Sequence, residues 1–503
     1  MLEGILTGLS TALSLTNIFM VSTGVLSGTL IGMLPGLGPI SAIALMIPIT
    51  YGFDSASGMI LMAGVYYGAI FGGSTSSILI NAPGVAGTVA TAFDGYPLAK
   101  QGKAGKALAV AAYSSFFGGT IGAVFLLLGA PLLARFSTSF QSADYFALML
   151  MGLVAVSVFT PKGQFLKAIS MTIIGLMLST VGMDNVTGTQ RFTFGQLNLF
   201  DGISFLLLAM ATFALSEALI ITLGSQHDNY QAFLTSDLHN LKVSKKELKE
   251  IAPTIGRSSV LGFLIGVLPG AGATIASFLA YGMEQAFSFG NTKVKFGDGN
   301  LKGLAAPETA NNAASTGSFV PLLTLGIPGS GTTAIMLGAL ISYGVQPGPQ
   351  LYTESPEVFW SVIISMYLGN VVLLILNLPL IPYIARLISL PQRFLIPFIL
   401  FFSLIGVYLV SFNTFDIYMM VGFATIAISL RFLEFPMAPM LIGFVLGNLL
   451  EDNLRRSLLI SNGKLEFLWE RPITLAIFSI TIIILTFPLY RFIRSKLQTK
   501  NNL

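Results

Sequence analysis

The stretch LIGMLPGLG at residues 30–38 interrupts an apolar segment, and LIGVLPGAG at residues 264–272 repeats the interruption, with Pro269 following Pro35 by 234 residues. A second break follows each copy, GGSTSSILINAPG at 72–84 and GSFVPLLTLGIPG at 317–329, and here Pro328 follows Pro83 by 245 residues. A helix that stops at membrane depth leaves backbone groups that lipid cannot satisfy. Interrupted hydrophobic segments at matching places in two halves are typical of the substrate site of a secondary transporter.

The composition indicates a membrane protein. Of the 503 residues 54% are hydrophobic and 10% are charged, whereas a soluble domain has about 25% charged residues. The pattern accommodates roughly ten to twelve spans of about 20 residues each. The net charge of +4 gives no support to nucleic-acid binding, and the absence of cysteine excludes disulfides, thiolate nucleophiles and Cys-ligated metals.

The expected fold is an all-α polytopic membrane protein with two repeats of spanning helices in inverted topology. Each repeat contains two Pro/Gly-interrupted or re-entrant segments. The N-terminus lacks the basic region of a cleaved signal peptide. The expected parts are an N-terminal segment 1–14, repeat one 15–223 (interrupted segments 30–50 and 66–92), a polar cytoplasmic linker 224–257, repeat two 258–490 (interrupted segments 262–284 and 308–345) and a basic tail 491–503.

Basic residues indicate which loops face the cytoplasm. Lys100, Lys103 and Lys106 follow the second break of repeat one, and the lysine-rich linker comes four expected spans later, on the same side. The matching loop of repeat two, 346–356, has no Lys or Arg, as inverted repeats require. The arginines between 455 and 471 conflict with this scheme. Either the expected span 436–450 does not cross the membrane or that loop departs from the charge rule.

Glycines and small hydroxyl residues gather at the breaks and form the candidate substrate site. Glycine allows close backbone approach, and a helix that begins at a break presents free N–H groups to an anion. Packing between membrane helices also enriches such residues, but their occurrence in both copies favours a site. The candidate substrate-binding residues are Gly36, Gly38, Ser74, Thr75, Ser76, Ser77, Asn81, Pro83, Gly84, Gly270, Gly272, Pro328, Gly329, Ser330, Gly331, Thr332 and Thr333.

Glu308 is the strongest candidate for a carboxylate within the membrane. Burying a carboxylate there costs free energy, so such a residue is by default a candidate for function. Asn311 and Asn312 follow at spacings that bring them near it on a helix. A carboxylate with amide oxygens suits Na⁺, whereas a carboxylate alone suits a proton relay. The candidate cation-coupling residues are Thr274, Glu308, Asn311 and Asn312, with a candidate Na⁺ site at Glu308 and Asn311. At the membrane interface, Glu308 would only cap a helix.

Four further features bear on function. Asp94 lies near Lys100 in sequence, which favours a surface position over one inside the membrane. Tyr66 and Tyr67 suit either an aromatic belt or a pocket wall. Residues 95–104 lack the spacing of a P-loop, and both histidines lie in the polar linker, so a His-rich metal site is not expected.

At these residues the chain resembles the large membrane subunit of the tripartite tricarboxylate transporter family. The resemblance implies a bacterial inner-membrane, multi-pass symporter for carboxylates, driven by a cation gradient. It also implies a small membrane subunit and a periplasmic binding protein as partners. The matching stretches are GMLPGLGP at 32–39, YGAIFGGSTSSIL at 67–79, NAPG at 81–84, DGYP at 94–97, PETANNA at 307–313, GIPGS at 326–330 and QPGP at 346–349.

The leading hypothesis is a secondary active transporter that imports a di- or tricarboxylate by symport with Na⁺ or H⁺, with no enzymatic activity and no cofactor beyond the coupling ion. Its expected partners are the carboxylate, the two other subunits and membrane lipid, and no nucleic acid. Two alternatives compete with it. A membrane-embedded enzyme for a lipid-linked substrate would need a catalytic base or metal in the spans, and a passive channel or scaffold subunit would need no coupling site.

Overall fold

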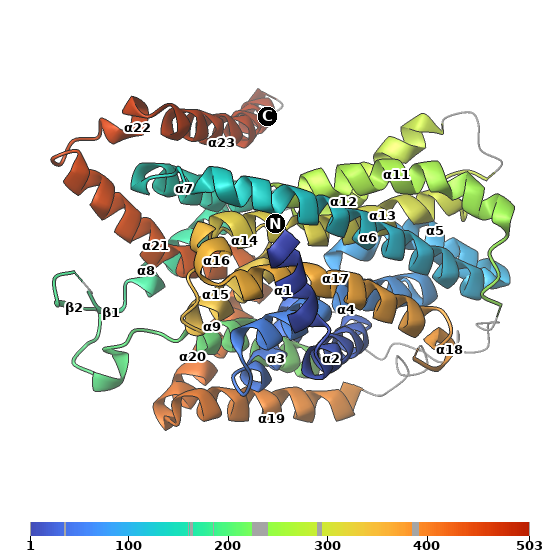
Figure 1. The fold of residues 1–503 in the computed structure, drawn as a ribbon, viewed down its shortest axis with the longest axis horizontal. Helices are drawn as coiled ribbons and strands as arrows, with labels where there is room; N and C mark the ends of the chain where they lie inside the picture. Colours follow the sequence, from blue (N-terminus) through green and yellow to red (C-terminus); the bar gives the residue numbers. More distant parts are fainter. Residues whose placement is uncertain are drawn as a thin grey trace.

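A computed structural model gives the fold (Figure 1). It describes residues 2–501 except 35–36, 159, 161–163, 185, 224–239, 289–293 and 385–391, so Gly36 and both histidines lie outside the described residues. Five helices of the described part are long and apolar enough to cross a membrane. The described residues are predominantly helical, and their strands form one two-stranded hairpin. The prediction of an all-α polytopic membrane protein is confirmed.

The first half consists of helices joined by short turns and the antiparallel β1–β2 hairpin. Its elements are α1 (Leu2–Ala12), α2 (Leu15–Gly32), α3 (Pro39–Thr50), α4 (Ser55–Ile80), η1 (Ala86–Thr88), α5 (Val89–Leu98), η2 (Ala99–Lys103), α6 (Ala104–Ser137), α7 (Ser142–Val158), α8 (Phe165–Ser179), β1 (Gly182–Met183), β2 (Gln190–Arg191), η3 (Leu197–Leu199), α9 (Phe205–Ala209), η4 (Met210–Leu215) and α10 (Ser216–Leu223).

All regular elements among the described residues of the second half are helices. Its first helix begins with a capping box at Ser244 and Glu247, inside the segment expected as linker. The elements are α11 (Lys245–Val267), α12 (Gly272–Phe287), α13 (Leu301–Gly317), α14 (Phe319–Leu325), α15 (Gly331–Ser342), α16 (Pro349–Glu354), α17 (Pro356–Asn377), α18 (Ile381–Ile384), α19 (Gln392–Ser411), α20 (Thr414–Phe432), α21 (Ala438–Ile460), α22 (Phe467–Glu470) and α23 (Pro472–Asn501).

The helix pairs α2–α4 and α11–α13 pack through equivalent glycines. A Cβ on Gly28 would overlap the backbone of Val65, and a Cβ on Gly262 would overlap the backbone of Ala310. Gly262 follows Gly28 by 234 residues and Ala310 follows Val65 by 245, which are the two offsets of the sequence repeat. Small residues allow such close approach of membrane helices. The duplicated sequence therefore folds into duplicated helix pairs.

Most of the increase in offset from 234 to 245 residues arises in the connection before α13. Asp54 caps α4 and Asn300 caps α13, each through its side chain. Residues 51–53 separate α3 from Asp54, whereas residues 288–299 separate α12 from Asn300. The ends of the two elements match again, because Asn81 and Gly326 close α4 and α14 in the left-handed conformation, with φ of 54° and 68°.

Helices α6 and α17 each follow the second break of their half, and they run in opposite directions. The 34 residues of α6 extend over roughly 50 Å, from the lysines before it to Ser137. The segment before α17 lies beside the end of α6, because Gln350 and Ser137 line one cavity. The segment after α17 reaches the start of α6, because Ile381 packs in one apolar cluster with Ala104.

These contacts define two ends of the molecule. The lysine face contains Lys106 and the start of α11, which are joined by an ion pair of 2.7 Å between Lys106 Nζ and Glu247 Oε1. The hairpin face contains Ser137 and the β1–β2 hairpin. In Figure 1 the hairpin lies at the left end of the molecule, and α11 and α5 lie at the right.

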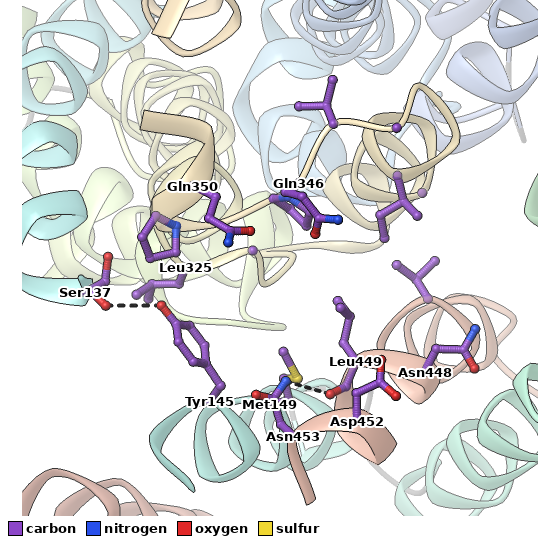
Figure 2. A pocket seen from close by; sticks show the side chains of 18 of the residues that line it. Ser137, Tyr145, Met149, Leu325, Gln346, Gln350, Asn448, Leu449, Asp452 and Asn453 are labelled. Atoms are coloured by element: carbon purple, nitrogen blue, oxygen red, sulfur yellow. Dashed lines mark hydrogen bonds between the residues drawn. The ribbon is translucent and has the colours of Figure 1, made fainter. Parts of the chain in front are cut away.

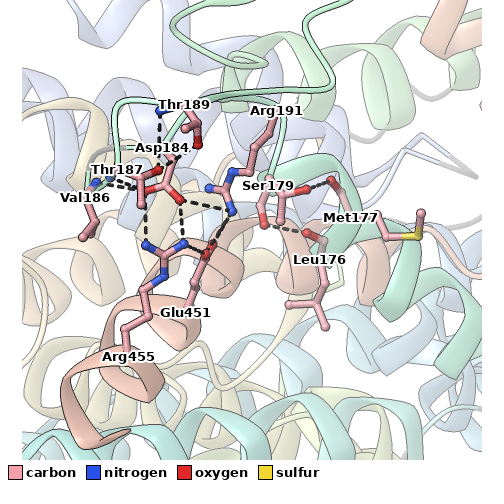
Figure 3. A network of polar contacts seen from close by, with 11 residues as sticks. Leu176, Met177, Ser179, Asp184, Val186, Thr187, Thr189, Arg191, Glu451 and Arg455 are labelled. Carbon is pink, nitrogen blue, oxygen red and sulfur yellow. Dashed lines mark hydrogen bonds and ion pairs between the residues drawn. The ribbon is translucent and has the colours of Figure 1, made fainter. Parts of the chain in front are cut away.

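Helix α21 carries two of the conflicting arginines, Arg455 and Arg456, to the hairpin face, and it extends well beyond the expected span 436–450. Arg455 donates to Asp184 of the hairpin and to Glu451, each at 2.6 Å, and Arg191 donates to Glu451 at 2.9 Å (Figure 3). The hydrogen bond from Arg455 holds the pKa of Asp184 well below its usual range. Local carboxylates therefore offset Arg455 and Arg191 on the face opposite the lysines.

Candidate functional site

The side chain of Glu308 on α13 lies at the junction of four helices and is fully buried. Ser74 Oγ on α4 lies 2.8 Å from both carboxylate oxygens, and Ser115 Oγ on α6 lies 2.9 Å from Oε2. Thr91 on α5 donates to Oε1, and Asn311 Nδ2 lies 3.5 Å from the same oxygen. The carboxylate thus brings together hydroxyl groups from the first half and an amide from the second.

Glu308 has no basic partner within the described part of the chain. The other buried glutamate, Glu284, pairs with Arg257 at 2.8 Å. An isolated carboxylate in a dry interior is expensive to keep charged. A proton or a cation is therefore the expected partner, and the carboxylate and hydroxyl oxygens at this position are among the ligands that hard cations prefer.

The remaining coupling candidates take different positions. Asn312 donates to Asn311 Oδ1 at 2.7 Å and to the Glu308 carbonyl at 3.0 Å, so it orients Asn311. Thr274 is half-buried on α12 and makes no hydrogen bond to these residues in the described structure. The structure therefore groups Glu308, Asn311 and Asn312 and leaves Thr274 apart from them.

The hydroxyl run before the second break of the first half lies inside α4, and only Ser74 reaches Glu308. Ser76 and Ser77 donate to the carbonyl of Gly73 at 3.1 and 2.8 Å, and Thr75 is buried without a hydrogen-bond partner in the described structure. The expectation that Ser76 lines a freed helix end is wrong, because α4 continues to Ile80. The break itself is confined to the residues after Asn81.

The glycine and proline positions of the first half shape the break. Asn81 is exposed and Pro83 is half-buried. A Cβ on Gly84 would overlap the carbonyl of Gly32, so Gly84 permits the loop to pack on α2. Gly38 is the N-cap residue of α3, and a Cβ added to it would meet no other atom within 4 Å.

The two breaks of the second half meet. The N–H of Gly270, which has a φ of 80°, donates to the carbonyl of Gly329 at 3.0 Å. Gly272 has a φ of 60°, and a Cβ added to it would lie 3.9 Å from Ser330 Cβ. Ser330 caps α15 and forms a capping box with Thr333. Pro328 and Thr332 are buried beside them.

The first half contributes to this second break. The Tyr66 hydroxyl on α4 lies 3.3 Å from Ser330 Oγ, and a Cβ on Gly331 would contact Ile40 at the start of α3. Tyr66 is 2% exposed, so it belongs to the interior rather than to an aromatic belt. Thr91, Ser115 and Tyr66 complete the site. No local pattern in the sequence distinguishes Thr91 or Ser115 from other hydroxyl residues nearby.

A cavity of about 850 Å³ opens on the hairpin face and reaches Gly326 at the second break. We call it the vestibule. Gln346 and Gln350 project into it from one wall and Asn448, Asp452 and Asn453 from α21 on the other (Figure 2). Neither Glu308 nor any of the side chains that hydrogen-bond its carboxylate lines this cavity. The carboxylate therefore does not face the vestibule.

Asp94 is fully buried, so the prediction of a surface position is wrong. Its carboxylate accepts hydrogen bonds from backbone N–H groups of the connection before α13, which lies about 200 residues further along the chain. The nearby lysine in the sequence was therefore a poor guide, because the residues that bury Asp94 come from the other half.

Comparison with known proteins agrees with this architecture. Residues 18–442 match the family model described as the tripartite tricarboxylate transporter TctA family. An uncharacterized 52.8 kDa protein in the TAR-I ttuC' 3' region of Agrobacterium vitis is 42% identical over 489 residues, 97% of this chain and 96% of that protein. An uncharacterized protein in the TAR-II ttuC' 3' region of the same organism is 42% identical over 235 residues, 47% of this chain and 96% of that protein. No solved structure matches.

Proposed function

The chain belongs to the tripartite tricarboxylate transporter TctA family, and from this premise we propose that it is the subunit that imports a di- or tricarboxylate by symport with Na⁺ or H⁺. The membrane is the bacterial inner membrane. A small membrane subunit completes the membrane part, and a periplasmic binding protein delivers the substrate.

The observation that carries this proposal is the buried Glu308 carboxylate, which is surrounded by hydroxyls and has no basic partner in the described structure. A fixed counter-charge would make the group structural. Without one, the group binds a proton or Na⁺ and can release it when its surroundings change. Its donors come from α4, α5 and α6 in the first half, whereas Glu308 itself belongs to the second. Relative movement of the halves would therefore change its affinity for the cation.

The substrate carboxylate binds at the second break of the second half, where backbone groups meet the hydroxyls of Ser330, Thr333 and Tyr66. One face of α13 connects this break to the cation site through Asn311, Ser315 and Ser318. Ser318 packs against Gly329 and lies ten residues after Glu308, roughly 15 Å along the helix. A cation at Glu308 would partly offset the negative charge of a substrate at this distance.

The two halves act as inverted repeats, and the vestibule on the hairpin face is the entry from the periplasm. The opposite directions of α6 and α17 support the inversion. The lysine face is cytoplasmic because its loops carry lysines, such as Lys100 and Lys103, that form no ion pair within the described residues.

Proteoliposomes that contain the membrane subunits test this function with a panel of labelled di- and tricarboxylates, supplied with the periplasmic binding protein. We expect accumulation only with an inward Na⁺ or proton gradient. Glu308→Gln should abolish gradient-driven accumulation and retain exchange of labelled for unlabelled substrate, because exchange needs no net movement of the cation. Accumulation by Glu308→Gln with unchanged cation dependence would refute the coupling role of Glu308.

A further inference from the structure

Asp94 on α5 holds the connection 294–300 in place. Its Oδ1 accepts the backbone N–H groups of Gly297 and Gly299 at 2.9 Å each and of Asn300 at 2.7 Å. Its Oδ2 accepts the Tyr281 hydroxyl at 3.1 Å. No lysine or arginine pairs with Asp94 in the part of the chain that the structure describes. Three backbone N–H groups of the loop converge on one carboxylate oxygen, so one side chain secures most of this loop.

Weaker contacts complete the closure on the lysine face. Gln101 Nε2 donates to the carbonyl of Asp298 at 2.9 Å, and the rings of Phe296 and Tyr281 meet edge to face at 5.6 Å. The loop covers the start of α13, where Leu304 is fully buried against Leu98 and Ala104. Without the loop, the lysine-face end of the α5–α13 interface would be open.

The same helix contacts both the loop and the cation site. Thr91 lies three residues before Asp94 on α5 and donates to Glu308, and α13 begins directly after the loop, at Leu301. A movement of α5 away from α13 would therefore break both contacts together. Release of the loop and loss of a donor to Glu308 are mechanically linked.

We propose that Asp94 is a positioning residue that latches the connection 294–300 across the cytoplasmic exit, so that its release opens the way out for cation and substrate. This inference rests on the proposed transport function for its purpose, but the latch itself is a property of the fold. The residue that holds this gate closed is thus a carboxylate that belongs neither to the vestibule nor to the cation site.

Cysteine labelling of the detergent-solubilised full-length protein tests the latch, because the chain has no native cysteine. A cysteine at Leu304 reports opening beneath the loop, and one at Ala134, also fully buried but near the far end of α6, reports general loosening. The reaction rate with a polar maleimide is measured in the parent, in Asp94→Ala and in Asp298→Asn. Asp298 is the matched control, because it is an exposed carboxylate on the same loop whose side chain makes no hydrogen bond in the described structure.

Asp94→Ala should raise the rate at position 304 at least 10-fold and leave position 134 unchanged, and Asp298→Asn should change neither. Asp94→Asn should give a smaller rise, because its amide oxygen still accepts from the loop. Equal rates at position 304 in Asp94→Ala and the parent would overturn the latch, and so would a parallel rise at both positions, which would make Asp94 a general support of the fold. If labelling behaves as expected while no carboxylate is transported, the transport function fails and the latch stands.

Discussion

Replacing Ser74 by alanine is the sharpest test of the cation site. The Ser74 hydroxyl lies 2.8 Å from both oxygens of Glu308, and the substitution removes it without adding volume. A hydrogen bond to a charged group contributes about 1.5–3 kcal/mol, and each 1.4 kcal/mol is about tenfold in affinity. We therefore expect the Na⁺ concentration for half-maximal uptake to rise about 10- to 100-fold if Na⁺ is the coupling ion.

The matched control is Ser76→Ala on the same helix. Ser76 is equally buried but donates only to the carbonyl of Gly73, within its own helix. Uptake is measured in proteoliposomes over a range of Na⁺ concentrations at constant ionic strength and substrate. If wild-type uptake depends on pH and not on Na⁺, the same pair of variants is compared over pH, and only Ser74→Ala should shift the curve. Identical behaviour of the two variants would refute the assignment of Ser74 to the cation site.

Three further results are expected. Gly262→Ala should lower the midpoint of thermal unfolding, because the added Cβ would overlap the Ala310 backbone. Such overpacking costs about 1–3 kcal/mol. Gly256→Ala on the same helix adds its Cβ into open space and should leave the midpoint unchanged. Cysteines at Lys103 and Gln350 should label from opposite sides of the membrane, and labelling from one side would exclude inverted repeats. Pairing with Arg455 lowers the pKa of Asp184, so this pair should stabilise the hairpin at any pH above about 3.9, the ordinary pKa of an aspartate. The stabilisation should be lost as the pH falls further and Asp184 takes up a proton. Limited proteolysis of the hairpin across acid pH would detect the loss.

Local sequence patterns predicted the helix breaks, but they did not reveal which distant residues contact Glu308. Proline and glycine interrupt helices through their own backbone chemistry, so the breaks at Pro269 and Pro328 were visible in sequence. The spacing of Glu308 and Asn311 is a property of one helical turn. Thr91 and Ser115, by contrast, meet Glu308 from other helices, about 200 residues earlier in the chain, and a hydroxyl residue in an apolar segment resembles any other.

The unequal halves have an electrical consequence. At the 245-residue offset of the second helices, the counterpart of Glu308 is Ala63, so symmetry does not supply a second carboxylate. In the proposed symport, one cation that crosses at Glu308 gains about 2.3 kcal/mol per 100 mV of membrane potential, which corresponds to roughly a 50-fold concentration ratio. A dicarboxylate that crosses with this single cation would carry net negative charge inward, against a potential that is negative inside. A fully charged dianion is therefore carried efficiently only when further cations accompany it.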